Sequence, residues 1–168
     1  MNSNIDIKYN DKTVKNNIFL TPAETQIEPK ISYNSNNDLY TFLMHDPDSV
    51  HGDYCHWLII NIPGNNLNNG DIILPYKGPS PPPKTGIHRY IFELYKQNNR
   101  LDPLEMVDRN MSMNDIKNKV GISSLVLISI IQFLSENENK FGGKKRKRKR
   151  KTTKKRKRRN KTKRHLHP

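Results

Sequence analysis

Three stretches of the chain carry the apolar patterns of β-strands. Residues 56–64, HWLIINIPG, are apolar on both faces, which predicts an inner strand that is buried on both sides. Residues 38–46, DLYTFLMHD, are rich in β-formers and end at Pro47, which cannot donate to a β-ladder. Residues 88–97, HRYIFELYKQ, alternate between two faces, and one of these faces carries Tyr90, Phe92 and Leu94.

Helix is predicted in few places. Residues 112–121 form a short helical pattern, with Ser112 as the N-cap and Gly121 as the stop. Residues 123–136 fit either a strand or a buried helix, and their β-branched residues favour the strand. Residues 21–25 read as a turn or a short helical start, and residues 76–88 as a Pro/Gly loop with little backbone freedom. Many short strands with little helix indicate a fold that is all-β dominated, with few helices.

The charge divides the chain into two parts. Residues 144–164 hold 17 of the 30 Lys and Arg and no acid, so the preceding residues carry 13 bases against 16 acids, a net charge of −3. We therefore expect a mildly acidic folded domain at residues 1–140 and a disordered polybasic tail at residues 141–168, which has no apolar surface to bury.

Three features that the sequence lacks indicate where the protein is located. Cys55 is the only cysteine, so no disulfide can form within the chain. The first residues lack the apolar core of a secretory signal, and the apolar stretch at residues 124–134 is too short to span a bilayer. These features predict a soluble, intracellular protein.

Acids and histidines gather at the start of the most apolar strand. Residues 45–56, HDPDSVHGDYCH, hold three acids, three histidines and the cysteine. Without further information these residues are either a binding site or incidental surface polarity. Several have a simpler interpretation: His45 is structural or exposed, His51 is solvated, Asp48 is a loop-fixing hydrogen-bond acceptor and Cys55 is a small buried hydrophobe. Likewise, Arg89 next to His88 makes a structural ion pair.

Three motifs together carry a family resemblance. The DPD of residues 46–48, the histidine-led apolar strand from His56, and the Pro-rich loop closing on GIHRY at residues 86–90 occur in the order and spacing of the phosphatidylethanolamine-binding protein family. The chain resembles that family, which includes the Raf kinase inhibitor proteins, over roughly residues 1–140. The resemblance implies a large antiparallel sheet packed on a smaller sheet, a few helices and a small anion pocket.

The resemblance also implies the residues of this pocket. In the family it is lined by the first Asp of DPD, the strand His, and the His and Tyr of HRY, with the Gly/Pro loop as a wall. Carried over, the ligand-binding residues are Asp46, His56, His88 and Tyr90, with Gly78, Pro81 and Pro82 as the wall. Imidazolium, phenol and backbone N–H groups are donors that suit a phosphate, an Asp beside imidazoles favours their charged form, and glycine lets the backbone approach a ligand.

The chain departs from the family pattern in several places. Val50 stands where the family usually has Pro, Ser80 stands where a second Gly is common, and the polybasic tail replaces a final helix. These departures leave open the size of the ligand and the width of the entrance to the pocket.

The polybasic tail predicts a second function. Its density of charge without aromatics suits contact with phosphates, either for association with nucleic acid or for nuclear import, with an anionic lipid surface as the second possibility. The residues assigned to this role are Lys144, Lys145, Arg146, Lys147, Arg148, Lys149, Arg150, Lys151, Lys154, Lys155, Arg156, Lys157, Arg158 and Arg159.

These observations predict a non-catalytic binding or regulatory protein. Its pocket would bind a phosphorylated small molecule, a phospholipid head group or a phosphopeptide, with no cofactor and no metal. Location would be nuclear or on nucleic acid, including a virion, with the cytoplasm as the alternative. The alternative function is a nucleic-acid-associated structural or packaging protein with a vestigial pocket. An Asp with two His also leaves open a weak hydrolase or a metal site of two histidines and one carboxylate.

Overall fold

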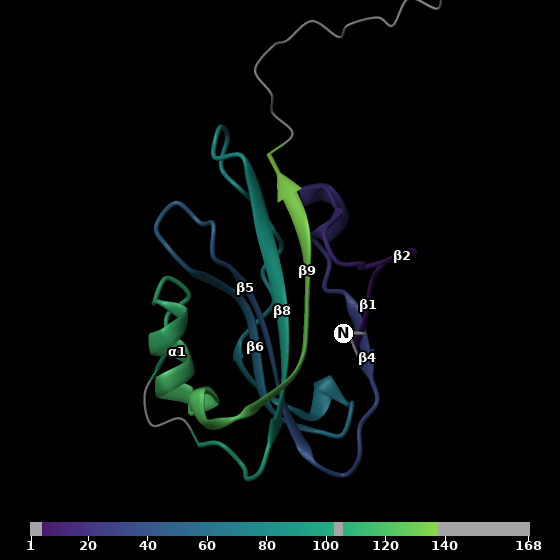
Figure 1. Cartoon of the computed structure of the whole chain (residues 1–168), viewed down its shortest axis with the longest axis vertical. Helices are drawn as coiled ribbons and strands as arrows, with labels where there is room; N and C mark the ends of the chain where they lie inside the picture. Colours follow the sequence, from purple (N-terminus) through teal and green to yellow (C-terminus); the bar gives the residue numbers. More distant parts are fainter. Residues whose placement is uncertain (1–4, 103–105, 138–168) are drawn as a thin grey trace, which may run out of the picture.

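Two β-sheets and one helix make up the fold in the computed structural model, which describes residues 5–102 and 106–137 (Figure 1). The smaller sheet has the order β2-β1-β4 and the larger one the order β3-β9-β8-β5-β6-β7. The smaller sheet consists of β1 Ile5–Tyr9, β2 Lys12–Thr13 and β4 Lys30–Tyr33. The larger sheet consists of β3 Ile18–Phe19, β5 Leu39–Asp46, β6 Tyr54–Pro63, β7 Asp71–Leu74, β8 Ile87–Gln97 and β9 Val126–Glu136.

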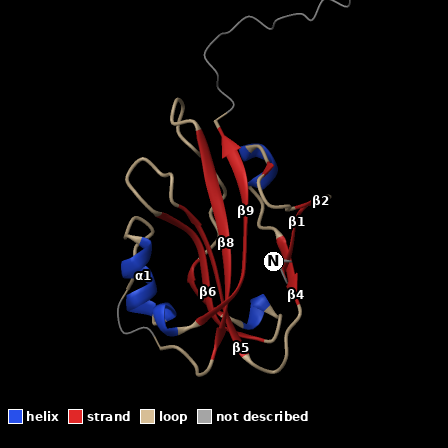
Figure 2. Ribbon diagram, in the orientation of Figure 1, coloured by secondary structure: helices blue, strands red, loops and turns tan. Residues whose placement is uncertain are grey.

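Within the described residues, helical structure is confined to short segments (Figure 2). The α-helix is α1 Met113–Val120, and the 3-10 turns are η1 Pro22–Thr25, η2 Leu67–Asn69 and η3 Ile122–Ser124. The α-helix begins and ends where the sequence predicts, because the Ser112 hydroxyl accepts a hydrogen bond from the Asp115 N–H and Gly121 adopts a left-handed φ of 85°. Residues 21–25 form η1, with a capping box between Thr21 and Glu24. The β-dominated fold is therefore confirmed, and residues 126–136 form a strand.

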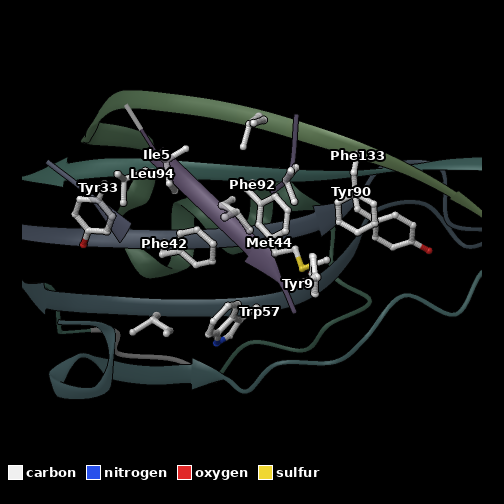
Figure 3. Close-up of a cluster of buried hydrophobic side chains, with 14 of the residues drawn as sticks. Ile5, Tyr9, Tyr33, Phe42, Met44, Trp57, Tyr90, Phe92, Leu94 and Phe133 are labelled. Carbon is white, nitrogen blue, oxygen red and sulfur yellow. The ribbon is translucent and has the colours of Figure 1, made fainter. Parts of the chain in front are cut away.

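The larger sheet is covered on both faces. Its first face packs against the smaller sheet, in a core that includes Phe42, Trp57, Tyr90, Phe92 and Phe133 (Figure 3). Its second face packs against α1, which lies on the opposite side of the sheet (Figure 1). This double covering explains why β6 is apolar on both faces: Trp57 and Ile59 enter the first core, and Leu58 and Ile60 enter the second.

The larger sheet is antiparallel except at one edge. There β3 runs parallel to β9, with Ile18 opposite Phe133 and Phe19 opposite Leu134, so the sheet as a whole is mixed. Segments so far apart in sequence can pair in either direction, since no short turn constrains them. The two-residue strand β3 thus covers only part of the edge strand β9.

Strand β6 contains a β-bulge near its first residues, where it pairs with the end of β5. Met44 pairs with Trp57 and His45 pairs with Cys55, so one step on β5 opposes two steps on β6 and His56 is the extra residue. A bulge re-aims the side chain of its extra residue and bends the strand. Here it directs His56 to the end of the sheet while Cys55 stays in the core beneath α1.

Candidate functional site

A cavity of about 340 Å³ opens where β5 ends and where β6 and β8 begin. All seven residues that the family resemblance implies for the pocket line this cavity: Asp46, His56, Gly78, Pro81, Pro82, His88 and Tyr90. Seven further residues complete the lining: Ser49, Val50, His51, Tyr54, Lys77, Ser80 and Asn110. The structure thus brings the predicted residues together, and their binding of a ligand stays a prediction.

Asp46 and His88 form a buried pair at the base of the cavity. His88 Nδ1 donates to Asp46 Oδ2 over 2.7 Å, and Asp46 Oδ1 accepts the Asp48 N–H over 2.8 Å. The other ring nitrogen, Nε2, lies 2.7 Å from the Thr85 hydroxyl, which itself donates to Pro82 O over 2.8 Å. Both His88 ring nitrogens therefore have a hydrogen-bond partner, one on the sheet and one in the Pro-rich loop. The pair therefore ties the Pro-rich loop to the sheet.

His56 lines the same cavity and has a different hydrogen-bond partner. Its Nδ1 donates to Lys77 O over 2.7 Å, which leaves Nε2 as the nitrogen that a molecule in the cavity would meet. Burial lowers the pKa of His56 to about 4, against smaller opposing effects of the hydrogen bond to Lys77 O and of the Asp46 carboxylate. At neutral pH the ring is therefore neutral, with a lone pair on Nε2. An anion in the cavity would favour its protonation.

Aromatic rings build the walls beside His56. The rings of Tyr54 and Tyr90 meet His56 edge-on, with centroids 4.8 Å and 5.1 Å away. Burial, with a contribution from the Asp46 carboxylate, raises the pKa of Tyr90, so its phenol keeps the proton that it could donate to an anion.

Lys77 brings a cation to the mouth of the cavity. Its ammonium donates to the Tyr54 hydroxyl over 2.8 Å and lies 5.2 Å from the centre of that ring. Sequence reasoning missed both residues. The signal for Tyr54 was its position two residues before His56 on the same strand, and the signal for Lys77 was its position next to Gly78.

Arg109 fixes the backbone around His56 from the loop that precedes α1. Its guanidinium donates to the carbonyls of Cys55 at 3.1 Å, His56 at 3.0 Å and Pro75 at 2.5 Å, and its own carbonyl accepts the Cys55 N–H. The sequence contains no signal for this role, since residues 98–110 read only as a loop.

Gly78 has a packing role that the sequence did not indicate. Its φ is ordinary, but a Cβ at this position would lie 2.8 Å from Thr25 O and 2.9 Å from Gln26 Cα. The glycine therefore lets the Pro-rich loop lie against η1, besides lining the cavity.

The simpler interpretations of the neighbouring residues are confirmed. Arg89 makes a two-pronged ion pair with Asp48, with both distances 2.8 Å, and Asp48 also accepts the Arg89 N–H. His45 is buried away from the cavity, 3.7 Å from Glu93 and 4.0 Å from Asp53. Cys55 is buried, and its pKa is raised to about 12 by burial. His51 is exposed, as expected for a solvated residue, although it also lines the cavity mouth.

Two features that define other classes of protein, a metal-binding cluster and a membrane-spanning helix, are absent from the described residues. Among the residues that the structure describes, no group of three His, Cys, Asp or Glu is arranged to hold a metal ion. No helix in the same described ranges is long and apolar enough to cross a membrane.

The comparison with protein families gives one match over most of the folded part. The model of the family named "Phosphatidylethanolamine-binding protein" matches residues 9–127. The chain belongs to this family. The match includes all three motifs on which the sequence resemblance rests, and it confirms that resemblance.

Individual relatives agree with the assignment to the phosphatidylethanolamine-binding proteins. The chain is 34% identical over 100 residues to the rice protein MOTHER of FT and TFL1 homolog 2, an alignment that covers 55% of this chain and 56% of the relative. It is 22% identical to the phosphatidylethanolamine-binding protein from Plasmodium vivax, with a TM-score of 0.63 and coverage of 80% and 85%. It is 21% identical to the carboxypeptidase Y inhibitor solved with its cognate proteinase, with a TM-score of 0.67 and coverage of 80% and 83%.

These similarities have a defined extent. The two solved structures share the fold of this phosphatidylethanolamine-binding protein family member. The alignments cover 32% to 56% of the length of the first curated relatives, so the chain spans about half the length of such relatives or less. The names of the two solved relatives describe binding in one case and inhibition in the other, and those activities belong to them.

Proposed function

We propose that this protein is a non-catalytic binding protein whose cavity reversibly binds a phosphate group, on a small molecule, a phospholipid head group or a phosphopeptide. The observation that supports the proposal is the cavity at the end of the larger sheet, where His88, a neutral and protonatable His56, the Tyr90 phenol and Lys77 surround one space. The Lys77 ammonium and the Tyr90 phenol can donate a hydrogen bond to a phosphate oxygen, and His56 Nε2 can do so after taking up one proton. His88 would donate from Nε2 once the Thr85 hydroxyl is displaced.

The electrostatics favour reversible binding over turnover. The Thr85 hydroxyl beside His88 Nε2 donates to Pro82 O, so its proton is not offered to the ring and the hydroxyl is not activated as a nucleophile. Cys55, the one thiol of the chain, lies in the core beneath α1 with its pKa raised, and is no nucleophile for this cavity. A phosphate bound between His56 and His88 would be held by hydrogen bonds and charge alone.

A second function concerns the polybasic residues 144–164, which lie outside the described residues. Seventeen Lys and Arg in this segment suit contact with nucleic acid phosphates, or recognition as a nuclear import signal. The sequence supports this role independently of the cavity. The alternative in which the domain only carries this segment, with a vestigial pocket, is separated from the first proposal by the experiment below.

Calorimetry of the full chain with phosphorylethanolamine and with phosphotyrosine tests the pocket. We expect saturable binding by the wild type, which is lost in His88→Gln and weakened about tenfold in Lys77→Met, since one hydrogen bond to a charged group contributes on the order of 1.5–3 kcal/mol. Lys15→Met is the matched control, because it removes one exposed cation that does not line the cavity.

Salt dependence separates the cavity from the polybasic segment. Binding to the segment should weaken steeply with salt, whereas binding inside the cavity should weaken little. Binding that is equal in the wild type and in both pocket variants would contradict the proposal and favour the vestigial pocket. Hydrolysis of a phosphate ester by the wild type that His56→Ala abolishes would contradict its non-catalytic part.

A further inference from the structure

The second ring nitrogen of His88 is covered by a hydroxyl of the chain itself. His88 is 1% exposed, and its Nε2 lies 2.7 Å from Thr85 Oγ1. The Thr85 hydroxyl donates to Pro82 O over 2.8 Å, so a second hydrogen bond holds it in place. Its oxygen therefore occupies the position beside Nε2 that an oxygen of a phosphate would take.

Thr85 closes a gap behind the wall of the cavity. His88 and Pro82 line the cavity, whereas Thr85 stays outside the lining that the described residues form and contacts both of them. A molecule in the cavity therefore reaches Nε2 of His88 only after the Thr85 hydroxyl has moved away.

This hydroxyl belongs to a turn with an unfavourable backbone conformation. The Thr85 N–H lies 3.4 Å from Pro82 O, which closes a four-residue turn. The third residue of the turn, Lys84, has a φ of 70°, a value that turns usually reserve for glycine or asparagine. In this conformation the Cβ of an L-residue comes too close to a backbone carbonyl oxygen. The closed turn therefore stores strain that an open turn would release.

A residue with positive φ stands on each side of Thr85. Lys84 precedes it, and Gly86, with a φ of 84°, follows it. Among the described atoms, none outside the chain neighbours of Gly86 lies within 4 Å of the place where a Cβ would stand, so this residue has room to rotate. Pro82 and Pro83 have a fixed φ, which confines the rotation to the residues around Thr85. The turn also projects beyond the end of the larger sheet, with its side chains exposed (Figure 1).

The rest of the Pro-rich loop is fixed independently of this turn. The Asn137 side-chain amide donates to Pro81 O over 2.9 Å, and the Gln26 side-chain amide donates to Pro79 O over 2.9 Å. Both contacts lie before the turn in the chain. The turn can therefore open while the wall of the cavity stays in place.

We propose that Thr85 gates the cavity: a phosphate oxygen of the ligand replaces the Thr85 hydroxyl at His88 Nε2, and the turn opens by rotation at Lys84 and Gly86. This inference rests on the proposed function of the cavity as a phosphate site, and it adds how access to His88 is controlled. Only hydrogen bonds and backbone angles change in this step, and the released hydroxyl is hydrated by solvent.

The closed turn competes with the ligand. The apparent affinity of a site is reduced by the fraction of molecules that are in the binding-competent state. The Thr85 hydroxyl favours the closed turn, and the left-handed φ of Lys84 opposes it. Substitutions at these two neighbouring residues should therefore change the affinity in opposite directions, whereas a turn that merely supports the wall would lose affinity in both cases.

Calorimetry of the full chain with phosphorylethanolamine tests the gate. We expect Thr85→Val, which keeps the shape of the side chain without its hydroxyl, to bind about tenfold more tightly than the wild type, since a hydrogen bond that opposes binding is lost. Thr85→Ser keeps the hydroxyl, so it is the matched control and should bind like the wild type.

The opposite change is made at the neighbouring residue. Lys84→Gly should bind several-fold more weakly, because glycine adopts a positive φ without strain and so stabilises the closed turn. Lys84→Ala removes the same charge but keeps the Cβ, and it should bind like the wild type. A melting curve of each variant shows that it is folded.

A second measurement requires no ligand. Diethyl pyrocarbonate acylates an accessible, uncharged imidazole nitrogen, and mass spectrometry of peptides measures its reaction at His88. The rate at His88 should rise in Thr85→Val and fall in Lys84→Gly, because Nε2 is accessible only while the turn is open.

Three results would overturn the gate. If the wild type binds phosphorylethanolamine and Thr85→Val binds it equally or more weakly, the gate fails and the phosphate pocket stands. If Lys84→Gly and Lys84→Ala weaken binding equally, the charge of Lys84 matters and the strain of the turn does not. If neither the wild type nor Thr85→Val binds, both the gate and the proposed function fail. Binding by Thr85→Val alone would support a gate that is almost always closed in the wild type.

Discussion

The neutral state of His56 leads to a direct test of the cavity's electrostatics. His56 is 5% exposed, donates from Nδ1 to Lys77 O, and has a pKa lowered to about 4 from 6.5, chiefly by burial. The unfolded chain therefore binds a proton on this residue between about pH 6.5 and pH 4, where the folded chain does not. Stability contributed by neutral His56 is fully present above about pH 6.5 and is lost as the pH falls towards 4.

The expected size of this effect follows from the two pKa values. Each tenfold change in proton affinity corresponds to about 1.4 kcal/mol, so the folded state should lose roughly 3 kcal/mol of unfolding free energy across the window. The variant His56→Gln cannot titrate, and its amide can still donate to Lys77 O. The difference in stability between wild type and variant should therefore shrink by this amount as the pH is lowered from about 7 to about 4.

Two measurements check this reasoning. Urea unfolding of both proteins across the pH range gives the difference in free energy, and the NMR signals of the His56 ring report its pKa and place its proton on Nδ1. A ring that titrates near 6.5, or an identical loss of stability in His56→Gln, would refute the account of a buried neutral imidazole. Addition of phosphorylethanolamine should raise the pKa of His56, because an anion stabilises the charged ring.

Three further predictions concern the supports of the cavity. Gly78→Ala should lose about 1–3 kcal/mol of unfolding free energy in urea, since the new Cβ meets the backbone of η1; Ser80→Ala in the same loop should lose little. Arg109→Met should cost a similar amount and weaken phosphorylethanolamine binding, because three carbonyls lose a charged donor, whereas the exposed Arg100→Met should be near neutral. Cys55 should react with a maleimide only after unfolding, since the thiol is buried with its pKa raised to about 12; rapid labelling of the native protein would contradict this.

Local sequence patterns predicted the elements that have strong local causes. The helix α1 has its cap at Ser112 and its stop at Gly121, and both act within a single turn. The burial of β6 on both faces could be predicted because nearly every side chain between Cys55 and Ile62 is apolar. The smaller sheet could not, because β1 and β4 have only a few apolar residues each and are stabilised by pairing with each other and by packing on the larger sheet.

The cavity was predictable only in part, through motifs that the chain shares with its family. Asp46, His56, His88 and Tyr90 stand in those motifs, and the structure places all four around one space. Arg109 lies 53 residues from His56 in the chain, and its role depends on a contact that no local pattern encodes. The bulge that turns His56 away from Cys55 likewise depends on how β6 registers against β5.

What the sequence determined by itself is the set of strands, the helix caps, the division of charge and the family motifs, since each depends on residues close together in the chain. The tertiary structure decided the direction of β3, the neutral state of His56 and the meeting of Asn137 with Pro81. Each of these depends on the distance between groups that are far apart in sequence, or on the burial that the two sheets and α1 impose together. Pairing direction, desolvation and contacts between distant segments are properties of the packed molecule, and they exist only after the chain has folded.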